Sequence, residues 1–383
     1  MRLLILGISG SIGRQCVDVI NKDKERFDLV AFSLGDKTRY ITPLLKKFPH
    51  VKHVCVKSPI KQKEYQKKYP NITFYSGDNG LLKLIENSNP DMVVNALVGF
   101  VGLCPTIKAL SMNKIIALAN KESLVVGGEL VNDLLRQGKG KLYPIDSEHV
   151  ALAKCLSVDD KNVDKLIITA SGGSFRNLKR EELTNVTKED ALRHPNWKMG
   201  EKITIDSATM VNKCFEIIEA HYLFNYPRDK IDVILHDESM IHSMVKYKNG
   251  LIRADISKPD MRVPIKYALY ESLIPFKTYQ SDDMNKFGPY HFHEFDIKRY
   301  PVIKYADEVI NKKGLYGTIL NASNEVAVYA FLRKEIPFLK IEECIDHMMR
   351  NVKNISHPTL EEILDCDKKV RKMTLDYIKG GKK

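Results

Sequence analysis

Three carboxylates have the spacing expected of a divalent metal site. Asp146 and Glu148 are separated by one residue, and Glu216 follows Asn212 and Lys213 within one helical turn. In an extended segment, side chains two positions apart point the same way, so we expect Asp146 and Glu148 to converge on one ion. On a helix, residues at i and i+4 share a face, which makes Glu216 the third ligand, next to Asn212. Three oxygen ligands without Cys or His favour Mg²⁺ or Mn²⁺ over Zn²⁺. The alternative is that these are ordinary surface carboxylates in a chain with 48 acidic residues.

A glycine-rich turn near the N-terminus predicts a dinucleotide site. Gly7, Gly10 and Gly13 follow an apolar run at 3–6 and precede a helical pattern that ends near Asn21. In a strand-turn-helix unit, the first glycine permits the tight turn, the second lets a pyrophosphate approach the backbone, and the third allows close helix packing. The helix N-terminus then faces the anion. Because the spacing is G-x-x-G-x-x-G rather than G-x-G-x-x-G, a tight turn without a ligand is the alternative.

The end of the second expected strand bears on the choice of cofactor. It lacks the acid that holds a ribose 2′-hydroxyl, and Lys37 and Arg39 follow Gly35 closely. Cations at this position accommodate a 2′-phosphate, which favours NADP, although Asp36 beside them argues against it.

Polar residues also follow the strand expected at 115–119. Open α/β sheets bind ligands at the carboxyl ends of their strands, so Asn120, Lys121 and Glu122 are candidates to face the nicotinamide and the reacting carbon. The alternative is that Asn120 caps a helix and that Lys121 and Glu122 form its solvated first turn.

The segment 193–202 has the composition of a lid. It is polar, is bounded by proline and glycine, and holds Trp197, the only tryptophan of the chain. A large aromatic residue on a loop suggests a cover over a site. The alternative is a surface tryptophan packed on a neighbour.

Composition excludes several classes of protein. The 383 residues carry a net charge of +12, but their lysine clusters have no interleaved aromatic residues and match no groove-reading motif, so we expect no nucleic-acid partner. No apolar run reaches the ~18 residues of a membrane span, and no targeting segment precedes Leu3. The seven cysteines are scattered without a C-x-x-C pair, which predicts free, mostly buried thiols in a reducing compartment. We therefore expect a soluble, cytoplasmic protein.

The chain is expected to be of the α/β class with several domains. Residues 1–147 alternate apolar runs with amphipathic stretches, which predicts a Rossmann-like domain with a parallel sheet. An α+β catalytic domain is expected at 148–275, without regular helices between its strands, followed by an aromatic linker at 276–301 and a C-terminal helical bundle at 302–383. The expected strands are Leu3–Leu6, Leu29–Phe32, His53–Val56, Met92–Ala96, Ile115–Ala119, Lys141–Ile145, Leu166–Thr169, Val233–His236, Ser243–Tyr247 and Leu251–Ile256.

Together, these motifs resemble one enzyme family, the 1-deoxy-D-xylulose 5-phosphate reductoisomerases. The matching segments span nearly the whole chain in order: G-I-S-G-S-I-G at 7–13, A-L-A-N-K-E-S-L-V at 117–125, P-I-D-S-E-H at 144–149, A-S-G-G-S-F-R at 170–176, R-H-P-N-W-K-M-G at 193–200, D-S-A-T-M-V-N-K at 206–213, K-P-D-M-R at 258–262 and L-N-A-S-N-E at 320–325. Among the departures, Asp36 stands where the family often has a basic residue, Ile8 where it has serine, and Ala170 and Ser174 where it has glycine and proline.

The resemblance implies roles for individual residues. Asp146, Glu148 and Glu216 are expected to hold Mg²⁺ or Mn²⁺ and, with Lys121, to form the catalytic set. The expected substrate-binding residues are Lys121, Ser147, Glu148, Ser171, His194, Trp197, Met199, Ser207, Asn212, Lys213 and Glu216. The expected NADPH-binding residues are Ser9, Gly10, Ser11, Ile12, Gly35, Asp36, Lys37, Asn120, Glu122, Gly200 and Met261.

The resemblance also implies a reaction. A homodimer of this family isomerises 1-deoxy-D-xylulose 5-phosphate, a sugar phosphate, and reduces the product with NADPH to 2-C-methyl-D-erythritol 4-phosphate in the non-mevalonate isoprenoid pathway. A metal-independent NADP dehydrogenase of another phosphorylated polyol is the alternative enzyme, and a nucleic-acid-binding protein is the alternative of another class. Activity that survives EDTA would favour the first, and salt-sensitive retention of DNA or RNA the second.

Overall fold

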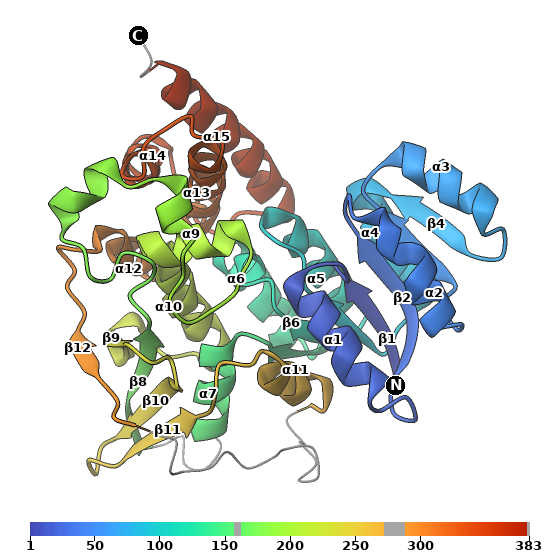
Figure 1. Cartoon of the computed structure of the whole chain (residues 1–383), viewed down its shortest axis with the longest axis horizontal. Coiled ribbons are helices and arrows are strands. Elements are labelled where there is room, and N and C mark those ends of the chain that lie inside the picture. The colour runs from blue at the N-terminus through green and yellow to red at the C-terminus, as the bar shows by residue number, and fades with distance from the viewer. Residues whose placement is uncertain (157–161, 272–287, 381–383) are drawn as a thin grey trace. The chain divides into compact units, whose positions relative to one another are not determined.

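The computed structural model describes residues 1–156, 162–271 and 288–380, which divide into two compact units (Figure 1). The first unit contains Met1–Ser123, Leu130–Asp146 and a later segment that starts at Met261. The second contains Leu124–Glu129, Ser147–Asp260 and the described residues from 288 onward. The division into three domains and a linker expected from the sequence stays a prediction.

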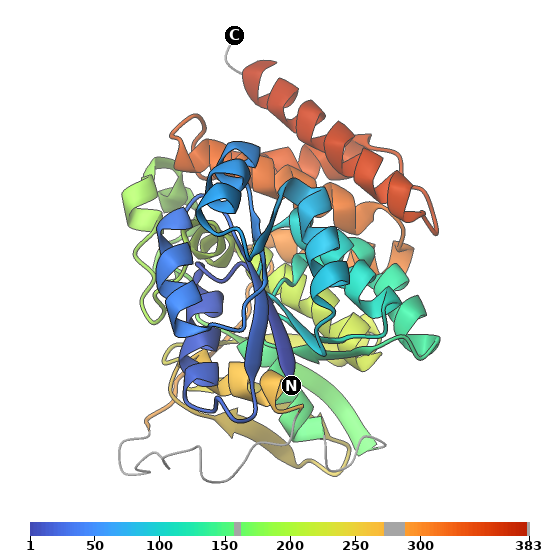
Figure 2. The ribbon, with the colours of Figure 1, turned by 90° about the vertical axis from the view of Figure 1, so that its right-hand side faces the viewer.

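A seven-stranded sheet with the order β4-β3-β2-β1-β5-β6-β7 forms the centre of the first unit. All its neighbouring strands are parallel: β1 (Arg2–Leu6), β2 (Asp28–Leu34), β3 (His53–Val56), β4 (Thr73–Ser76), β5 (Met92–Asn95), β6 (Ile115–Leu118) and β7 (Lys141–Pro144). Figure 2 shows helices on both sides of the sheet. Leu3, Leu4, Ile5 and Leu6 are therefore all fully buried, as expected for a central parallel strand.

The α/β prediction and the six predicted strands of this unit are confirmed, with ends that differ by at most two residues. Strand β4 was not predicted. It lies at the edge of the sheet and buries only Phe74 fully, so its four residues carry neither a continuous apolar run nor a clear alternation.

The helices of this unit connect the strands. They are α1 (Ser11–Asn21), α2 (Ile41–Lys47), α3 (Pro59–Lys68), α4 (Gly77–Ser88), α5 (Leu103–Ser111), α6 (Glu122–Arg136, whose residues 124–129 belong to the second unit) and α11 (Arg262–Leu269). Helix α11 comes from far along the chain and packs on α1. Just after it, the Tyr270 ring meets Phe27 edge-on at a centroid distance of 5.2 Å.

The second unit contains a five-stranded sheet with the order β11-β10-β8-β9-β12. Its strands are β8 (Val163–Ala170), β9 (Ile231–His236), β10 (Ile241–Tyr247), β11 (Ile252–Ile256) and β12 (Phe292–Glu294). The four strands predicted here are confirmed. Strand β12 falls within the predicted linker at 276–301 and pairs with β9; residues 276–287 lie outside the described part of the chain.

The helices of the second unit are α7 (Ser147–Leu156), α8 (Lys188–Ala191), α9 (Glu201–Thr209), α10 (Val211–Phe224), α12 (Lys304–Lys312), α13 (Tyr316–Leu332), α14 (Lys340–Asn351) and α15 (Leu360–Gly380). Helices α13, α14 and α15 pack together, as the C-terminal helical pattern predicted (Figure 1). The expectation of strands without regular helices between them is wrong. Strands β8 and β9 are parallel neighbours, and such a pair needs a crossover long enough to hold a helix, which α10 provides.

The prediction that residues 146–148 are extended is also wrong. Helix α7 begins at Ser147, so Glu148 lies in its first helical turn. Successive side chains then differ by about 100° rather than 180°, and the alternation argument does not apply.

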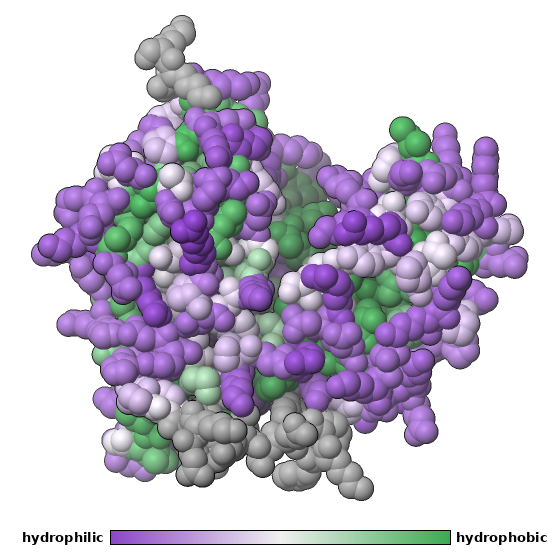
Figure 3. All heavy atoms as spheres, in the orientation of Figure 1, coloured by the Kyte–Doolittle hydropathy of each residue, from purple (hydrophilic) through white to green (hydrophobic). Residues whose placement is uncertain are grey.

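The surface and the cysteines agree with the composition. The face in Figure 3 is mainly hydrophilic, including the region over the lysine-rich helix α3. All seven cysteines are free thiols, six of them buried. Among the described residues, no helix has both the length and the apolar content that a bilayer span requires.

Candidate active site

The glycine turn has the geometry that a dinucleotide site needs. Gly7 has a φ of +79°, and a Cβ there would lie 2.5 Å from the carbonyl oxygen of Ala96. A Cβ on Gly13 would lie 2.5 Å from the carbonyl oxygen of Gly7. Gly10 is the N-cap residue of α1, and no side chain forms a capping hydrogen bond at this end of the helix. The first N–H groups of α1 therefore face the turn, where an anion can accept from them.

In the loop after β2, the negative charge of Asp36 is offset by a lysine from elsewhere in the sheet. Gly35, Asp36 and Lys37 are exposed, and the Asp36 carboxylate lies 3.6 Å from the Lys57 ammonium. Lys57 follows β3, the neighbouring strand in the sheet. The sequence pointed to Lys37 or Arg39 as the balancing cation, whereas the ion pair in the structure is made by Lys57.

Asn120 lies one residue before Lys121, the N-cap of α6, and its side chain contacts the first turn of that helix. Its Oδ1 accepts from the backbone N–H of Ser123 at 3.1 Å, and its Nδ2 donates to the carbonyl oxygens of Leu97 and Gly99 at 3.0 and 2.9 Å. Lys121 and Glu122 are not a solvated first turn, because only 6% and 7% of their surfaces are exposed. The Lys121 ammonium donates to the Asp146 carboxylate at 2.7 Å.

Four side chains from α7 and α10 form a charged cluster. The Lys213 ammonium pairs with the Glu216 carboxylate and lies 3.3 Å from that of Glu148. Asn212 Nδ2 donates to Glu216 Oε1 at 2.5 Å, which confirms the shared helical face expected from the i, i+4 spacing. Glu216 is 1% exposed, so a buried carboxylate here has a cation and an amide as partners.

Two of the three predicted ligands lie close together in the second unit. Glu148 and Glu216 each place a carboxylate oxygen within 4.8 Å of the other. Asp146 is joined by one peptide bond to Ser147, the first residue of α7, and the Ser147 hydroxyl donates to Glu148 at 2.6 Å. Such a spread of oxygens suits a single hard cation.

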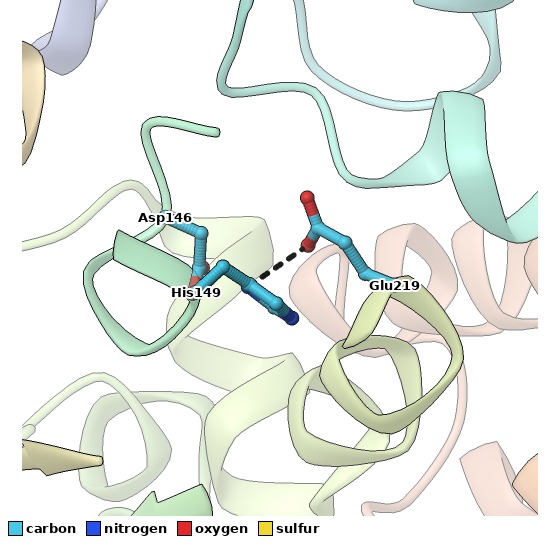
Figure 4. Close-up of side chains that lie close together, drawn as sticks. All are labelled: Asp146, His149 and Glu219. Carbon is cyan, nitrogen blue, oxygen red and sulfur yellow. Dashed lines mark ion pairs between the residues drawn. The ribbon is translucent and has the colours of Figure 1, made fainter. Parts of the chain in front are cut away.

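A second buried pair, which the sequence analysis missed, comes from the same two helices, α7 and α10. The His149 and Glu219 side chains are buried and face each other at 3.5 Å (Figure 4). His149 Nε2 donates to the backbone carbonyl of Glu216 at 2.9 Å. Two signals could have revealed this pair, because His149 follows Glu148 directly and Glu219 lies three residues after Glu216 on the same helix.

A glycine loop brings together the residues expected to bind phosphate. Gly173 has a φ of +70°, and a Cβ there would lie 2.7 Å from the carbonyl oxygen of Ser207 at the end of α9. Ser171 lies two residues before Gly173 in the same loop, and its hydroxyl accepts from the backbone N–H of Gly173 at 3.2 Å. The Lys213 ammonium donates to the carbonyl oxygen of Thr169 at 2.5 Å, which ties the start of α10 to the end of β8. The end of β8 and the loop after it therefore lie near the Lys213 ammonium, the end of α9 and the N-terminus of α10. Such groups can bind a phosphate.

His194 connects the predicted lid to this loop. Its Nδ1 accepts from the backbone N–H groups of Asn196 and Trp197 at 3.2 and 3.0 Å, so Nδ1 carries no proton. Nε2 therefore bears the proton and donates to the Ser171 hydroxyl at 3.1 Å. Burial, with a smaller contribution from Arg176, lowers the pKa of His194 from 6.5 to about 4.

This pKa predicts how stability depends on pH. Between pH 6.5 and about 4 the unfolded chain binds a proton at His194 that the folded chain does not, so this residue reduces stability as the pH falls through that range. A His194→Asn variant keeps an acceptor but does not titrate, so the stability of the native protein should decrease relative to the variant as the pH is lowered. Urea unfolding of both proteins at several pH values measures the difference, and a constant difference would contradict the assignment.

Trp197, Met199 and Gly200 follow His194 in the same segment. The Trp197 side chain is half-buried, and its ring lies 6.2 Å from that of His242. Gly200 is the N-cap of α9. Met261 belongs to the first unit, where it precedes α11.

Comparison with known proteins identifies the family. Residues 3–128 match the family model of 1-deoxy-D-xylulose 5-phosphate reductoisomerase, and residues 142–224 and 256–373 match two models of its C-terminal domains. The reductoisomerase of Lysinibacillus sphaericus is 45% identical over 383 residues, which cover 99% of this chain and 100% of that protein. The chain belongs to the 1-deoxy-D-xylulose 5-phosphate reductoisomerase family.

Further members agree over the same length. The Bacillus subtilis reductoisomerase is 44% identical over 375 residues, covering 96% of this chain and 97% of that protein. A solved reductoisomerase in complex with NADPH, fosmidomycin and magnesium superposes with a TM-score of 0.91 at 34% identity, covering 100% of this chain and 99% of that one. The Zymomonas mobilis enzyme in complex with NADPH gives 0.90 at 33% identity, covering 98% of each chain. The resemblance stated from sequence motifs is therefore confirmed for this reductoisomerase.

Proposed function

We propose that this chain converts 1-deoxy-D-xylulose 5-phosphate to 2-C-methyl-D-erythritol 4-phosphate, with a divalent metal ion and NADPH, in the non-mevalonate isoprenoid pathway. The observation that carries the proposal is the position of the Lys213 ammonium on α10, which contacts Glu216 on the same helix, Glu148 on α7 and the end of β8. Acidic oxygens for a cation thus lie beside cationic and hydroxyl groups for a phosphate. Family membership over the whole chain supports the same reaction.

Asp146, Glu148 and Glu216 are proposed to hold Mg²⁺ or Mn²⁺. Their donor atoms are hard oxygens, and the almost complete burial of Glu216 favours a bound cation over a bare carboxylate. The ion, when bound, stabilises negative charge that develops on substrate oxygens during rearrangement. Lys121, paired with Asp146, supplies a further positive charge that can contact the substrate.

The substrate phosphate is proposed to bind Ser171, Ser207, Asn212 and Lys213, with Ser147 and His194 contacting the same substrate. Binding energy from a phosphate remote from the reacting carbons can be used to hold those carbons in place. The cofactor is proposed to bind the residues expected from the sequence, with its pyrophosphate over the N-terminus of α1 and Met261 beside the nicotinamide. NADPH held by these residues would supply the hydride that reduces the isomerised product.

The segment 193–202 is proposed to cover the substrate, with Trp197 and Met199 over its carbon chain. Trp197→Ala should raise KM and lower kcat, roughly thirtyfold in kcat/KM, because about 2 kcal/mol of apolar contact is removed. Steady-state kinetics with the sugar phosphate varied at saturating NADPH test this. Unchanged constants would show that Trp197 is only a surface residue packed on His242.

A homodimer and a cytoplasmic location are also proposed. Leu251, Ile252, Ile256 and Phe292 on β11, its preceding turn and β12 are all at least 39% exposed, which is unusual for apolar residues on both edges of one sheet. A second copy of the chain would cover them. Light scattering should give twice the chain mass of 43.8 kDa, and Ile252→Lys should shift the measured mass toward that of one chain. A monomeric native protein contradicts the proposal.

The proposed cytoplasmic location agrees with the seven free thiols, which suit a reducing compartment. Subcellular fractionation tests it.

The deciding experiment mixes the purified protein with 1-deoxy-D-xylulose 5-phosphate, NADPH and Mn²⁺ and follows the absorbance of the reduced nicotinamide. We expect oxidation of NADPH that stops when EDTA is added and resumes with excess Mn²⁺. No oxidation with any divalent ion contradicts the proposed reaction. Oxidation that continues in EDTA supports a metal-independent dehydrogenase instead.

A further inference from the structure

A hollow of about 450 Å³ lies in the first unit between α1 and the segment that contains α2. Ser11 and Arg14 line it from α1, and Tyr40 lines it from the residue before α2. Its other charged residues are Lys47, at the end of α2, and Asp18, one turn beyond Arg14. The hollow therefore adjoins the glycine turn through Ser11, the first residue of α1.

Cations gather at the end of the hollow near this turn. Arg14 Nε donates to the carbonyl oxygen of Gly10 at 3.3 Å, so the guanidinium is directed back along α1 toward the turn. The Arg39 guanidinium lies 5.3 Å from the centroid of the Tyr40 ring. A hydrogen bond and the charge of Arg39, with weaker contributions from Arg14 and Lys37, lower the pKa of Tyr40. Three positive charges thus act on one phenol hydroxyl.

Asp36, the acidic residue of the loop after β2, pairs with another lysine and does not neutralise the charges of Arg14 and Arg39. Asp36 is paired with Lys57, on the side of β3. Among the residues that the structure describes, Arg39 forms no ion pair with a carboxylate. Asp18 lies farther along α1 from Gly10 than Arg14 does. An anion that enters beside Arg14 therefore meets net positive charge.

We propose that Arg14 and Arg39 together hold the 2′-phosphate of NADPH, with Tyr40 donating a hydrogen bond to it. A dinucleotide with its pyrophosphate on the N-terminus of α1 places its adenosine ribose at the end of β2. The 2′-substituent then lies between α1 and the residues that follow β2, where Arg14 and Tyr40 line the hollow and Arg39 lies over the Tyr40 ring. Two guanidinium groups match the several oxygens of a dianionic phosphate. The chain thus prefers NADPH through Arg14 and Arg39, although Asp36 occupies the position expected to be basic.

The inference rests on the proposed use of NADPH. Binding of two cofactor fragments can distinguish failure of the inference from failure of the proposed function. Isothermal titration with 2′,5′-ADP and with 5′-AMP measures the contribution of the 2′-phosphate in the native protein and in Arg14→Met and Arg39→Met. Each variant should bind 2′,5′-ADP roughly tenfold more weakly, because one charge-assisted contact is lost, and 5′-AMP within about twofold of the native protein. Arg136→Met, at the C-terminal end of α6 in the same unit, is the matched control for loss of one positive charge and should change neither affinity.

Three results would overturn the inference. Unchanged binding of 2′,5′-ADP to both variants removes the two arginines from the site. Equal weakening of both fragments shows a general effect on the nucleotide site. The same loss in Arg136→Met shows an effect of net charge alone. If the native protein binds neither fragment, the dinucleotide site itself is absent, and the proposed function fails together with the inference.

Discussion

Replacement of Glu216 by glutamine is expected to reduce kcat by at least about a thousandfold while the protein stays folded, since metal ions contribute several kcal/mol to stabilising charge in a transition state. Glutamine has the same shape but no charge. Its Oε1 can still accept from Asn212, whereas its Nε2 is a donor that would face the Lys213 ammonium. The substitution therefore removes one anionic ligand and directs a second donor at a buried cation.

Direct binding measurements separate a metal role from a folding role. Mn²⁺ binding, followed by electron paramagnetic resonance, should be lost in Glu216→Gln, while NADPH binding, followed by fluorescence, should stay within about twofold of the native protein. Glu361→Gln, an exposed carboxylate in the first turn of α15, is the control and should change neither. Parallel loss of Mn²⁺ and NADPH binding would mean that Glu216 supports the fold instead.

Replacement of Lys213 by methionine is expected to lower kcat/KM by on the order of a hundredfold, mainly through KM, because the proposed ion pair to the substrate phosphate would be lost. Methionine keeps most of the length and the apolar stem but carries no charge. The Lys213 ammonium lies against Glu148, Glu216 and the carbonyl oxygen of Thr169, so the loss is local to the cluster. Steady-state kinetics with varied sugar phosphate measure the change, with the exposed Lys248→Met as the control.

The two variants should differ in their response to metal. Removal of a positive charge beside two carboxylates favours a divalent cation, so Lys213→Met should bind Mn²⁺ at least as tightly as the native protein, whereas Glu216→Gln should not bind it. Weaker Mn²⁺ binding in Lys213→Met would place Lys213 in support of the metal site rather than of the phosphate.

The parts of the site that were predicted are those set by local geometry. The turn at Gly7 and Gly13 follows from steric limits that act within a few residues, and the structure shows close contacts at both positions. Asn212 and Glu216 share a face because one helix turn separates them. The strand expected at 3–6 is buried on both faces, as its continuous apolar run indicated.

Other expectations failed because the deciding contacts are distant in sequence. Residues 146–148 have no local feature that distinguishes an extended segment from the start of α7. The partner of Asp36 is Lys57, which comes close only because β2 and β3 are neighbours in the sheet. The pairing of His149 with Glu219 depends on α7 packing beside α10.

The sequence by itself determined the family, the glycine turn, most of the strands and the types of residue available for chemistry. Only the tertiary structure decided which of those residues meet: Glu148 reaches Lys213 and Glu216, and the loop at Gly173 closes on the end of α9. The physical reason is that side-chain chemistry and local steric limits are written in neighbouring residues, whereas the approach of distant segments is set by the packing of all the elements between them.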